Sequence, residues 1–259
     1  MKKFILESPP DSLGNVYIGG KDFHYLAVVR RMKPGSVFEA ILPDGTCVNL
    51  TVVSVTGKTM TASCSLRRAP DQQDCPFVPP LYLFQSLPRG AKMDLIVRQA
   101  AETGVSRIVP FVSGYSQAKT GKTIDRWAKI VREARQQSGS LVPTSVEEPL
   151  DFDGLLKYWK DLIKEQPCGT GILLHQDPLE SLTFHDYLDN SPQFVALAVG
   201  PEGGFSPEEV RVFMSAGFKP VVMGNTVLRT ETAALYGAAA IRTILSERAS
   251  WLLKNKMPL

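Results

Sequence analysis

The hydrophobic positions change their spacing about a third of the way along the chain. Before residue 70 they form short runs separated by Asp-Gly and Gly-Lys turns, which predict strands at 37–42, 47–55 and 59–66. An apolar stripe with a basic end, at 22–31, predicts a helix ahead of these strands. We therefore expect a small β-barrel over residues 1–70.

Beyond residue 80 the pattern alternates between short buried strands and helices. We predict strands at 81–87, 107–112, 171–175, 194–199 and 218–223, and helices at 91–102, 123–138, 153–164, 207–216 and 233–244. Such alternation is typical of an α/β domain with a parallel sheet covered on both faces. The proline-rich stretch before residue 81 has no periodicity and predicts a linker. The expected organisation is a β-barrel domain (1–70), a linker (71–80) and an α/β domain (81–259).

Each of the last two predicted strands ends in a glycine turn that leads toward a helix. The first turn is Gly200-Pro201-Glu202-Gly203-Gly204, and the second starts with Gly224-Asn225. Either turn alone is equally well explained as an ordinary tight connection. The second, however, is followed by Arg229-Thr230-Glu231-Thr232, a charged pair flanked by hydroxyl groups at a helix start. Because the carboxyl ends of parallel strands meet at one edge of a sheet, the two turns predict a single ligand pocket.

Composition excludes several classes of protein. With 259 residues, of which 44% are hydrophobic, the chain is large enough for two domains. No stretch resembles a signal peptide or is long enough to span a membrane, and the four cysteines are not at metal-ligand spacing. We expect a cytoplasmic protein with reduced thiols, no metal and no membrane association.

The net charge of +3 does not by itself indicate a nucleic-acid partner. Basic residues gather between positions 119 and 135, where Lys122, Arg126 and Lys129 share one helix face by their spacing. A solvated helix surface is one interpretation of this face. If the substrate is RNA, the same three residues are the best candidates for phosphate contact.

The glycine turns and several shorter motifs resemble those of a known family. Gly200 to Ser206, together with Gly224 to Ala233, is similar to the paired signature of the ribosomal RNA small subunit methyltransferase E family (RsmE), in the SPOUT superfamily. The stretch from Phe23 to Arg30, followed by Gly35, is similar to the PUA-like barrel of that family. Matching motifs in the middle of the chain are Lys92-Met93-Asp94, Glu102-Thr103-Gly104-Val105 and Glu133-Ala134-Arg135-Gln136-Gln137-Ser138.

The resemblance implies a methyltransferase that uses S-adenosyl-L-methionine to methylate N3 of a uridine in small-subunit ribosomal RNA. It also implies a trefoil knot in the parallel-sheet domain, a homodimer, and the small ribosomal subunit as partner. The cofactor-binding residues carried over in this way are Leu174, His175, Gly200, Pro201, Glu202, Gly203, Gly204, Met223, Gly224, Asn225, Val227, Leu228, Arg229, Thr232 and Ala233. The candidates for RNA contact are Arg30, Arg31, Arg89, Lys92, Lys122, Arg126 and Lys129.

The implied chemistry suggests roles for three charged residues. Methyl transfer from a sulfonium is a direct displacement, so the positioning of donor and acceptor should contribute most to the rate. The N3 proton must leave, and negative charge then spreads onto the ring carbonyls, where we expect Arg229 to stabilise it. Glu231 or Glu202 would accept the proton, although a structural ion pair with an arginine is an equal alternative for either glutamate. The proton acceptor therefore stays open.

Four positions depart from the pattern of the family. Gln99, Tyr115 and Ser140 stand where basic residues are expected, and Thr103 stands where leucine is expected. These departures change the expected RNA contacts and leave the two glycine turns intact.

Two other classes of protein stay open. A non-catalytic RNA-binding or ribosome-associated protein with the same fold would bind RNA without binding S-adenosyl-L-methionine. An enzyme that cradles a phosphate with the turn at Gly200 to Gly204 is the second class. Against it, the chain has no G-x-x-x-x-G-K-[ST] motif, and the glycine turn lies late in the chain.

Overall fold

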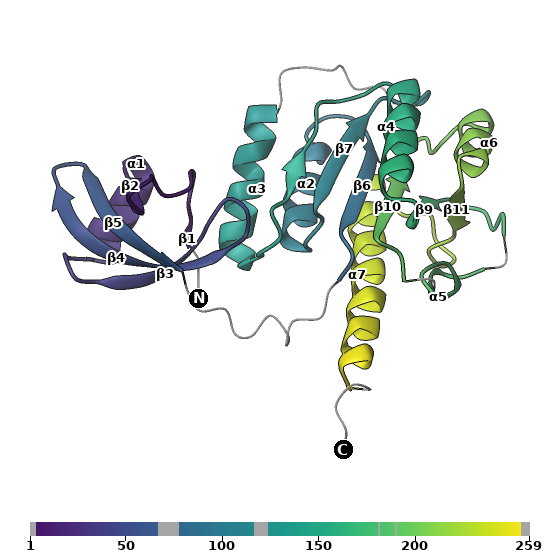
Figure 1. Cartoon of the computed structure of the whole chain (residues 1–259). Helices are drawn as coiled ribbons and strands as arrows, with labels where there is room; N and C mark the ends of the chain where they lie inside the picture. The colour runs from purple at the N-terminus through teal and green to yellow at the C-terminus, as the bar shows by residue number, and fades with distance from the viewer. Residues whose placement is uncertain (1–3, 67–77, 117–123, 181, 190, 255–259) are drawn as a thin grey trace. The chain divides into compact units, whose positions relative to one another are not determined.

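The computed structural model describes residues 4–66, 78–116, 124–180, 182–189 and 191–254 (Figure 1). The chain divides into two compact units. One comprises Met1–Asp74 with Arg135–Pro143, and the other comprises Cys75–Ala134 with Thr144–Leu259. The predicted linker lies outside the described residues as far as residue 77, so most of it stays a prediction.

The first unit contains an open five-stranded sheet. Its strands are β1 (Phe4–Ile5), β2 (Asn15–Ile18), β3 (Val37–Ile41), β4 (Cys47–Thr56) and β5 (Thr59–Leu66), in the order β1-β3-β4-β5-β2. The three predicted strands are confirmed as β3, β4 and β5. The edge strands β1 and β2 are absent from the prediction because two and four residues give too short a pattern. Within the described residues β1 pairs with β3 and β2 with β5, so the expected barrel is an open sheet.

The helix predicted at 22–31 is confirmed, but most of it is a π-helix and not an α-helix. It consists of α1 (Gly20–Phe23), followed directly by the π-helix η1 (His24–Val29). Leu26 of η1 is fully buried in the hydrophobic core of the first unit, where it joins side chains from the strands. The helical segment ends before Arg31, whose φ of 53° lies in the left-handed region that side chains rarely adopt.

The second unit is built on a six-stranded parallel sheet, as the alternation of strands and helices predicts. Its strands are β6 (Leu81–Ser86), β7 (Arg107–Phe111), β8 (Ser145–Val146), β9 (Gly169–Leu174), β10 (Phe194–Val199) and β11 (Phe218–Val221), in the order β11-β9-β10-β6-β7-β8. Every neighbouring pair is parallel. Of these strands, the two-residue β8 alone is missing from the prediction.

Helices cover both faces of this sheet. Within the described residues they are α2 (Lys92–Glu102), α3 (Ile124–Ser138), α4 (Phe152–Glu165), α5 (Phe184–Tyr187), α6 (Pro207–Ser215) and α7 (Thr230–Lys254). Side chains of α2, α3 and α7 pack into the core on one face, and those of α4 and α6 pack into the core on the other. The four-residue α5 is too short to have been predicted from periodicity.

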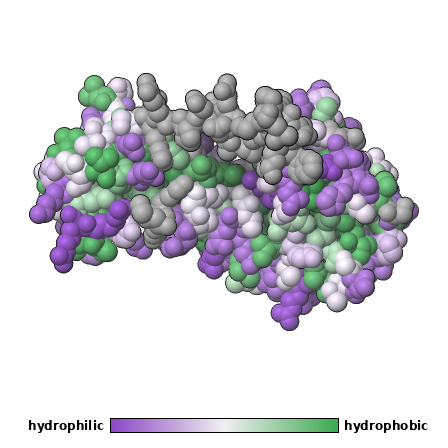
Figure 2. All heavy atoms as spheres, turned by 90° about the horizontal axis from the view of Figure 1, so that it is seen from below, coloured by the Kyte–Doolittle hydropathy of each residue, from purple (hydrophilic) through white to green (hydrophobic). Residues whose placement is uncertain are grey.

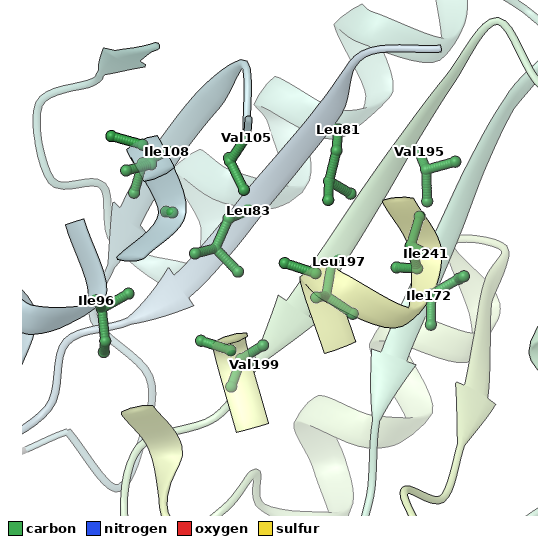
Figure 3. Packing of buried hydrophobic residues seen from close by; sticks show 14 of the residues in the cluster. Leu81, Leu83, Ile96, Val105, Ile108, Ile172, Val195, Leu197, Val199 and Ile241 are labelled. Carbon is green, nitrogen blue, oxygen red and sulfur yellow. The ribbon is translucent and has the colours of Figure 1, made fainter. Parts of the chain in front are cut away.

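The central strand β10 shows why the chain needs both layers. All six of its residues are buried, with Leu197 on one face and Phe194 on the other. Figure 3 shows Leu197 beside Ile241 of α7. Gly237 lets this helix approach closely, because a Cβ there would lie 3.0 Å from Leu174 Cδ1 and 3.0 Å from Leu197 Cδ2.

Within the described residues, the structure contains neither a candidate membrane span nor a candidate metal centre. Among the described residues, no helix is long and apolar enough to cross a membrane. The same residues contain no group of three His, Cys, Asp or Glu side chains that could hold a metal ion. On the face shown in Figure 2, hydrophilic and apolar residues are intermingled.

Candidate functional site

The carboxyl ends of three neighbouring strands border a cavity of about 190 Å³. Leu174 ends β9, Val199 ends β10, and Val222 directly follows β11; all three line the cavity. The two glycine turns therefore meet at one site, as the sequence predicts. This edge of the sheet is where ligands bind in open α/β folds.

Most of the predicted cofactor-binding residues line this cavity, and some do not. Those on its wall are Leu174, His175, Gly200, Pro201, Glu202, Gly203, Gly204, Met223, Val227, Leu228 and Ala233. Those that are not on its wall are Gly224, Asn225, Arg229 and Thr232. The additional lining residues are Gln176, Val199, Phe205, Val222, Thr226 and Thr230. Each of these is a direct neighbour of a predicted residue, so a wider window around each turn would have included them.

The turn from Gly200 to Gly204, which follows β10 and is called the β10 turn below, owes its tight shape to its glycines. At Gly200 a Cβ would lie 3.1 Å from the carbonyl carbon of Gly204, inside the turn itself. Gly204 has a φ of +69°, which glycine adopts without strain. Its backbone N donates to the carbonyl oxygen of Pro201 at 3.0 Å. Gly200 and Gly204 therefore determine the shape of the turn.

The start of α6 holds the other end of this turn. Ser206 and Glu209 form a capping box, in which Ser206 Oγ accepts from the N of Glu209 at 3.2 Å and Glu209 Oε2 accepts from the N of Ser206 at 2.8 Å. Pro207 occupies the first turn of the helix, as the sequence predicts. The turn between β10 and α6 is thus fixed at both ends.

A buried hydrogen-bond chain joins the two glycine turns to each other. Thr230 Oγ1, at the first residue of α7, donates to the carbonyl oxygen of Gly200 at 2.6 Å. The hydroxyl oxygen of Thr230 in turn accepts from Gln85 Nε2 at 3.0 Å, and Gln85 Nε2 also donates to the carbonyl oxygen of Ser86 at 2.8 Å. Gln85 is fully buried on β6. A polar side chain in a sheet core needs such partners, and here they tie β6, the β10 turn and α7 together.

Glu202 lies on the cavity wall in an ion pair that the sequence did not predict. Lys92 Nζ donates to Glu202 Oε1 at 2.6 Å, and the backbone N of Arg89 donates to the same oxygen at 3.2 Å. Partial burial works against the charged form of Glu202, but the hydrogen bonds from these groups outweigh it and lower the pKa of Glu202. The partner in this structural ion pair is a lysine, where we expected an arginine.

Arg229 and Glu231 flank Thr230 but do not line the cavity. The Arg229 side chain is exposed, and its carbonyl oxygen accepts from the N of Ala233 at 2.8 Å in the first turn of α7. Glu231 is half-buried, and its Oε2 has no hydrogen-bond partner among the described residues. No ion pair joins these two side chains in the part of the chain that the structure describes. The structure therefore gives no support to the predicted alternative of an Arg229–Glu231 ion pair.

The predicted RNA-binding residues are spread over both units. Arg30 and Arg31 are exposed in the first unit, and Arg89 and Lys129 are exposed in the second. Two more already have partners within the chain: Lys92 binds Glu202, and Arg126 forms an ion pair with Asp94. Lys122 lies outside the described residues.

Of the residues that depart from the family pattern, Tyr115 has the most informative place. It is half exposed on the loop after β7, beside Gly203 of the β10 turn. Gln99 is half-buried on α2, and its Oε1 has no hydrogen-bond partner within the described residues. Ser140 is half-buried after α3.

Comparisons with known proteins find relatives of this chain in sequence and in structure. Residues 76–242 match the model of a family described as the RNA methyltransferase domain. The chain is 29% identical over 250 residues to ribosomal RNA small subunit methyltransferase E of Mycobacterium bovis, covering 94% of this chain and 92% of that protein.

Two solved structures are similar over nearly the whole chain. Ribosomal RNA small subunit methyltransferase E from Neisseria gonorrhoeae, bound to S-adenosyl methionine, has a TM-score of 0.76 at 24% identity, covering 94% of this chain and 98% of that one. A candidate methyltransferase from Legionella pneumophila, in complex with the bound cofactor SAM, has a TM-score of 0.73 at 25% identity, with the same coverage of 94% and 98%.

Proposed function

The chain belongs to the RNA methyltransferase family, and from this premise we propose that it transfers the methyl group of S-adenosyl-L-methionine to small-subunit ribosomal RNA. The observation that carries the proposal is the single cavity formed by both glycine turns at the ends of β9, β10 and β11. The identity of the RNA follows from the resemblance to ribosomal RNA small subunit methyltransferase E over 94% of the chain.

The walls of the cavity fit an adenosine-containing methyl donor. Leu174, Met223 and Leu228 provide apolar surface of the kind that binds a purine ring, and the turn at Gly200 to Gly204 presents backbone groups for hydrogen bonds. The carboxylate of Glu202 lies on the same wall and complements a positively charged sulfonium. When bound, the cofactor supplies an activated methyl group.

We propose N3 of a uridine as the acceptor, with two residues of this chain acting on it. Glu202 lines the cavity and is ionised, so it accepts the N3 proton as the methyl–nitrogen bond forms and releases it to solvent. Glu231 does not line the cavity and is therefore the weaker candidate for this step. Arg229, exposed beside the cavity residues Leu228 and Thr230, stabilises the negative charge on the ring carbonyls. Methyl transfer would form the methyl–nitrogen bond as the methyl–sulfur bond of the donor breaks, with the neutral thioether as the leaving group.

The finer architecture of the family belongs to the same proposal. We infer a PUA-like role for the sheet of the first unit in RNA binding, a trefoil knot around the cofactor cavity, and a homodimer. Support comes from the similarity in fold to the Neisseria gonorrhoeae enzyme over 94% of this chain. The packing of α7 against α2, on the face opposite α4 and α6, is consistent with a chain that returns across the sheet after the second turn.

The direct test is methyl transfer from labelled S-adenosyl-L-methionine to small-subunit ribosomal RNA and to assembled small subunits, followed by nucleoside mass spectrometry. We expect N3-methyluridine as the product, and we expect it to be missing from the ribosomal RNA of cells that lack the protein. RNA binding without cofactor binding would instead identify a non-catalytic RNA-binding protein. Methylation of another atom would keep the enzyme class and reject uridine N3.

A further inference from the structure

A second cavity adjoins the first along the same edge of the sheet. It measures about 280 Å³ and is lined by Arg89, Gly114, Tyr115, Glu202 and Gly203. These residues follow β6, β7 and β10, three neighbouring strands, whereas the first cavity lies at β9, β10 and β11. The two cavities share the β10 turn, because Glu202 and Gly203 line both.

Tyr115 rests against the β10 turn, two residues of which line both cavities. A Cβ at Gly203 would lie 3.1 Å from Tyr115 Cβ and 3.5 Å from its ring atoms Cγ and Cδ2. The residue is nevertheless 50% exposed. An aromatic ring that is fixed at its base and open elsewhere offers a face on which a nucleobase can stack.

Hydrogen bonds hold the loop that carries Tyr115 before any ligand binds. Ser86 Oγ lies 2.7 Å from Ser113 Oγ and 2.8 Å from Ser116 Oγ, which joins the loop to β6. The N of Gly114 donates to Glu209 Oε1 at 2.7 Å, which joins it to the capping box of α6. Because one anchor lies on β6 and the other in the capping box of α6, the position of the ring is preorganised.

The remaining wall of the second cavity is polar and charged. Glu202 is held there by Lys92 and by the backbone N of Arg89, so its carboxylate can accept from a base N–H. The Arg89 side chain is exposed, and no described residue forms an ion pair with it. A guanidinium in this position is suited to a phosphate of the same nucleotide.

We propose that the second cavity receives the target base of the RNA after it has left its stack, and that Tyr115 stacks on this base. The proposal rests on the proposed methyl transfer to RNA. An enzyme that acts on a base edge must bring that edge to the donor, and the two cavities share Glu202 and Gly203 of the β10 turn. Tyr115 stands where a basic residue is expected, so this chain uses stacking where an ionic contact would otherwise act.

Three variants of the full chain test the role of the ring. Tyr115→Phe keeps the ring and loses the hydroxyl, Tyr115→Leu keeps apolar bulk without a ring, and Tyr115→Ala removes both. With small-subunit ribosomal RNA as substrate, we expect kcat/KM for Tyr115→Ala to fall about 5- to 150-fold, the size of one lost base–aromatic stack of ~1–3 kcal/mol. The kcat/KM of Tyr115→Leu should fall to a similar extent, and the kcat/KM of Tyr115→Phe should stay near the wild-type value. The Kd for S-adenosyl-L-methionine and the unfolding temperature should stay the same in all three.

Each contrary result has its own meaning. Wild-type protein that binds the cofactor and methylates no RNA would reject the proposed function itself. Active wild type with Tyr115→Leu as efficient as Tyr115→Phe would reject stacking, because bulk alone would then suffice. A loss of cofactor affinity or of unfolding temperature that accounts for the loss of activity would make Tyr115 a structural residue and overturn the proposal.

Discussion

Glu202 lines both cavities, and Lys92 contributes most to keeping its carboxylate charged. Partial burial raises the pKa of Glu202, and the hydrogen bond from Lys92 is the main cause that brings it below the ordinary value of 4.5. A carboxylate with a lowered pKa stays ionised at neutral pH and loses its charge only in more acidic solution.

The Lys92–Glu202 pair gives a prediction about pH. Activity that needs ionised Glu202 is lost as pH falls through the pKa of this carboxyl group. Lys92→Gln removes the ammonium group that lowers this pKa, so the pKa rises. The acid limb of kcat against pH should therefore move to higher pH, measured at saturating RNA. Lys160→Gln, which removes an exposed charge on α4, is the control and should leave the limb in place. If the acid limb of kcat against pH were unchanged in Lys92→Gln, Glu202 would not be the residue that accepts the proton.

Arg229 is the second residue whose role can be isolated. Because its side chain is exposed, Arg229→Ala should leave the unfolding temperature within about a degree of wild type. Loss of a charge-stabilising group typically lowers kcat about 100- to 1000-fold, which is the effect we expect in the methyl-transfer assay. A variant that turns over as fast as wild type would show that another group stabilises the uridine ring carbonyls.

At the residue scale, sequence reasoning finds the turns and misses what joins them. Gly200, Gly203 and Gly204 are visible as a motif, and the structure places them on one wall. Thr230 also lies in a predicted segment, but its partner Gln85 is 145 positions away. Nothing in the local sequence around Gln85 indicates that its amide reaches α7. The Lys92–Glu202 pair, 110 positions apart, is hidden for the same reason.

At the scale of elements, the cavity is a junction of three strand ends and two helix starts. The capping box of α6 fixes the β10 turn, and Thr230 fixes the first turn of α7 to it. Strands and helices of at least five residues follow from periodicity, apart from the π-helical turn η1, which shares its apolar spacing with an ordinary helix. The last helix is found but underestimated, because α7 runs from Thr230 to Lys254 where 233–244 is predicted. The short elements β1, β8 and α5 carry too little pattern to be predicted, whereas the four-residue β11 is found because the Gly224-Asn225 turn follows it.

The buried chain from Gln85 to Gly200 should support both the fold and the cofactor cavity. Thr230→Val keeps the shape of the side chain and leaves two polar groups without their partner. We expect a loss of ~1–3 kcal/mol in the free energy of unfolding, as is usual for an unsatisfied buried group, together with weaker binding of S-adenosyl-L-methionine. Urea denaturation and calorimetric titration measure the two effects. Thr243→Val, at an exposed position of the same helix, should change the unfolding free energy by no more than ~0.5 kcal/mol. If both variants had equal effects, the hydrogen-bond chain would not account for the loss of stability or of cofactor binding.

At the scale of the whole molecule, the chain forms two compact units. In each sheet, some strands that lie side by side are far apart in the sequence. The alternation of strands and helices predicts a parallel sheet, yet it does not reveal that β10 lies between β9 and β6. That order decides which loops meet, because it places the β10 turn beside the loops of both neighbours. The site therefore depends on the topology of the second unit as much as on its motifs.

RNA binding is also a property of the whole molecule, since the candidate cations occur in both units. We expect the triple variant Lys122→Gln, Arg126→Gln and Lys129→Gln to flatten the dependence of log Kd for RNA on log salt. Each lost phosphate contact lowers the slope by ~0.7–0.9. Lys157→Gln, Lys160→Gln and Lys164→Gln together remove three exposed charges from α4 and serve as the matched control. If both triple variants had the same slope, the helix face around Arg126 would not contact RNA phosphates. It would then be a solvated surface on which Arg126 pairs with Asp94.

The binding of S-adenosyl-L-methionine to the cavity at the ends of β9, β10 and β11 is the most direct test of the central claim. Ala233 lines this cavity from α7, so Ala233→Phe should fill it, whereas Ala240→Phe alters the same helix at a position outside the cavity wall. Calorimetric titration of the full chain should show one cofactor bound per chain in wild type and in Ala240→Phe, and none in Ala233→Phe. Wild-type protein without measurable binding, or a folded Ala233→Phe with unchanged affinity, would contradict it.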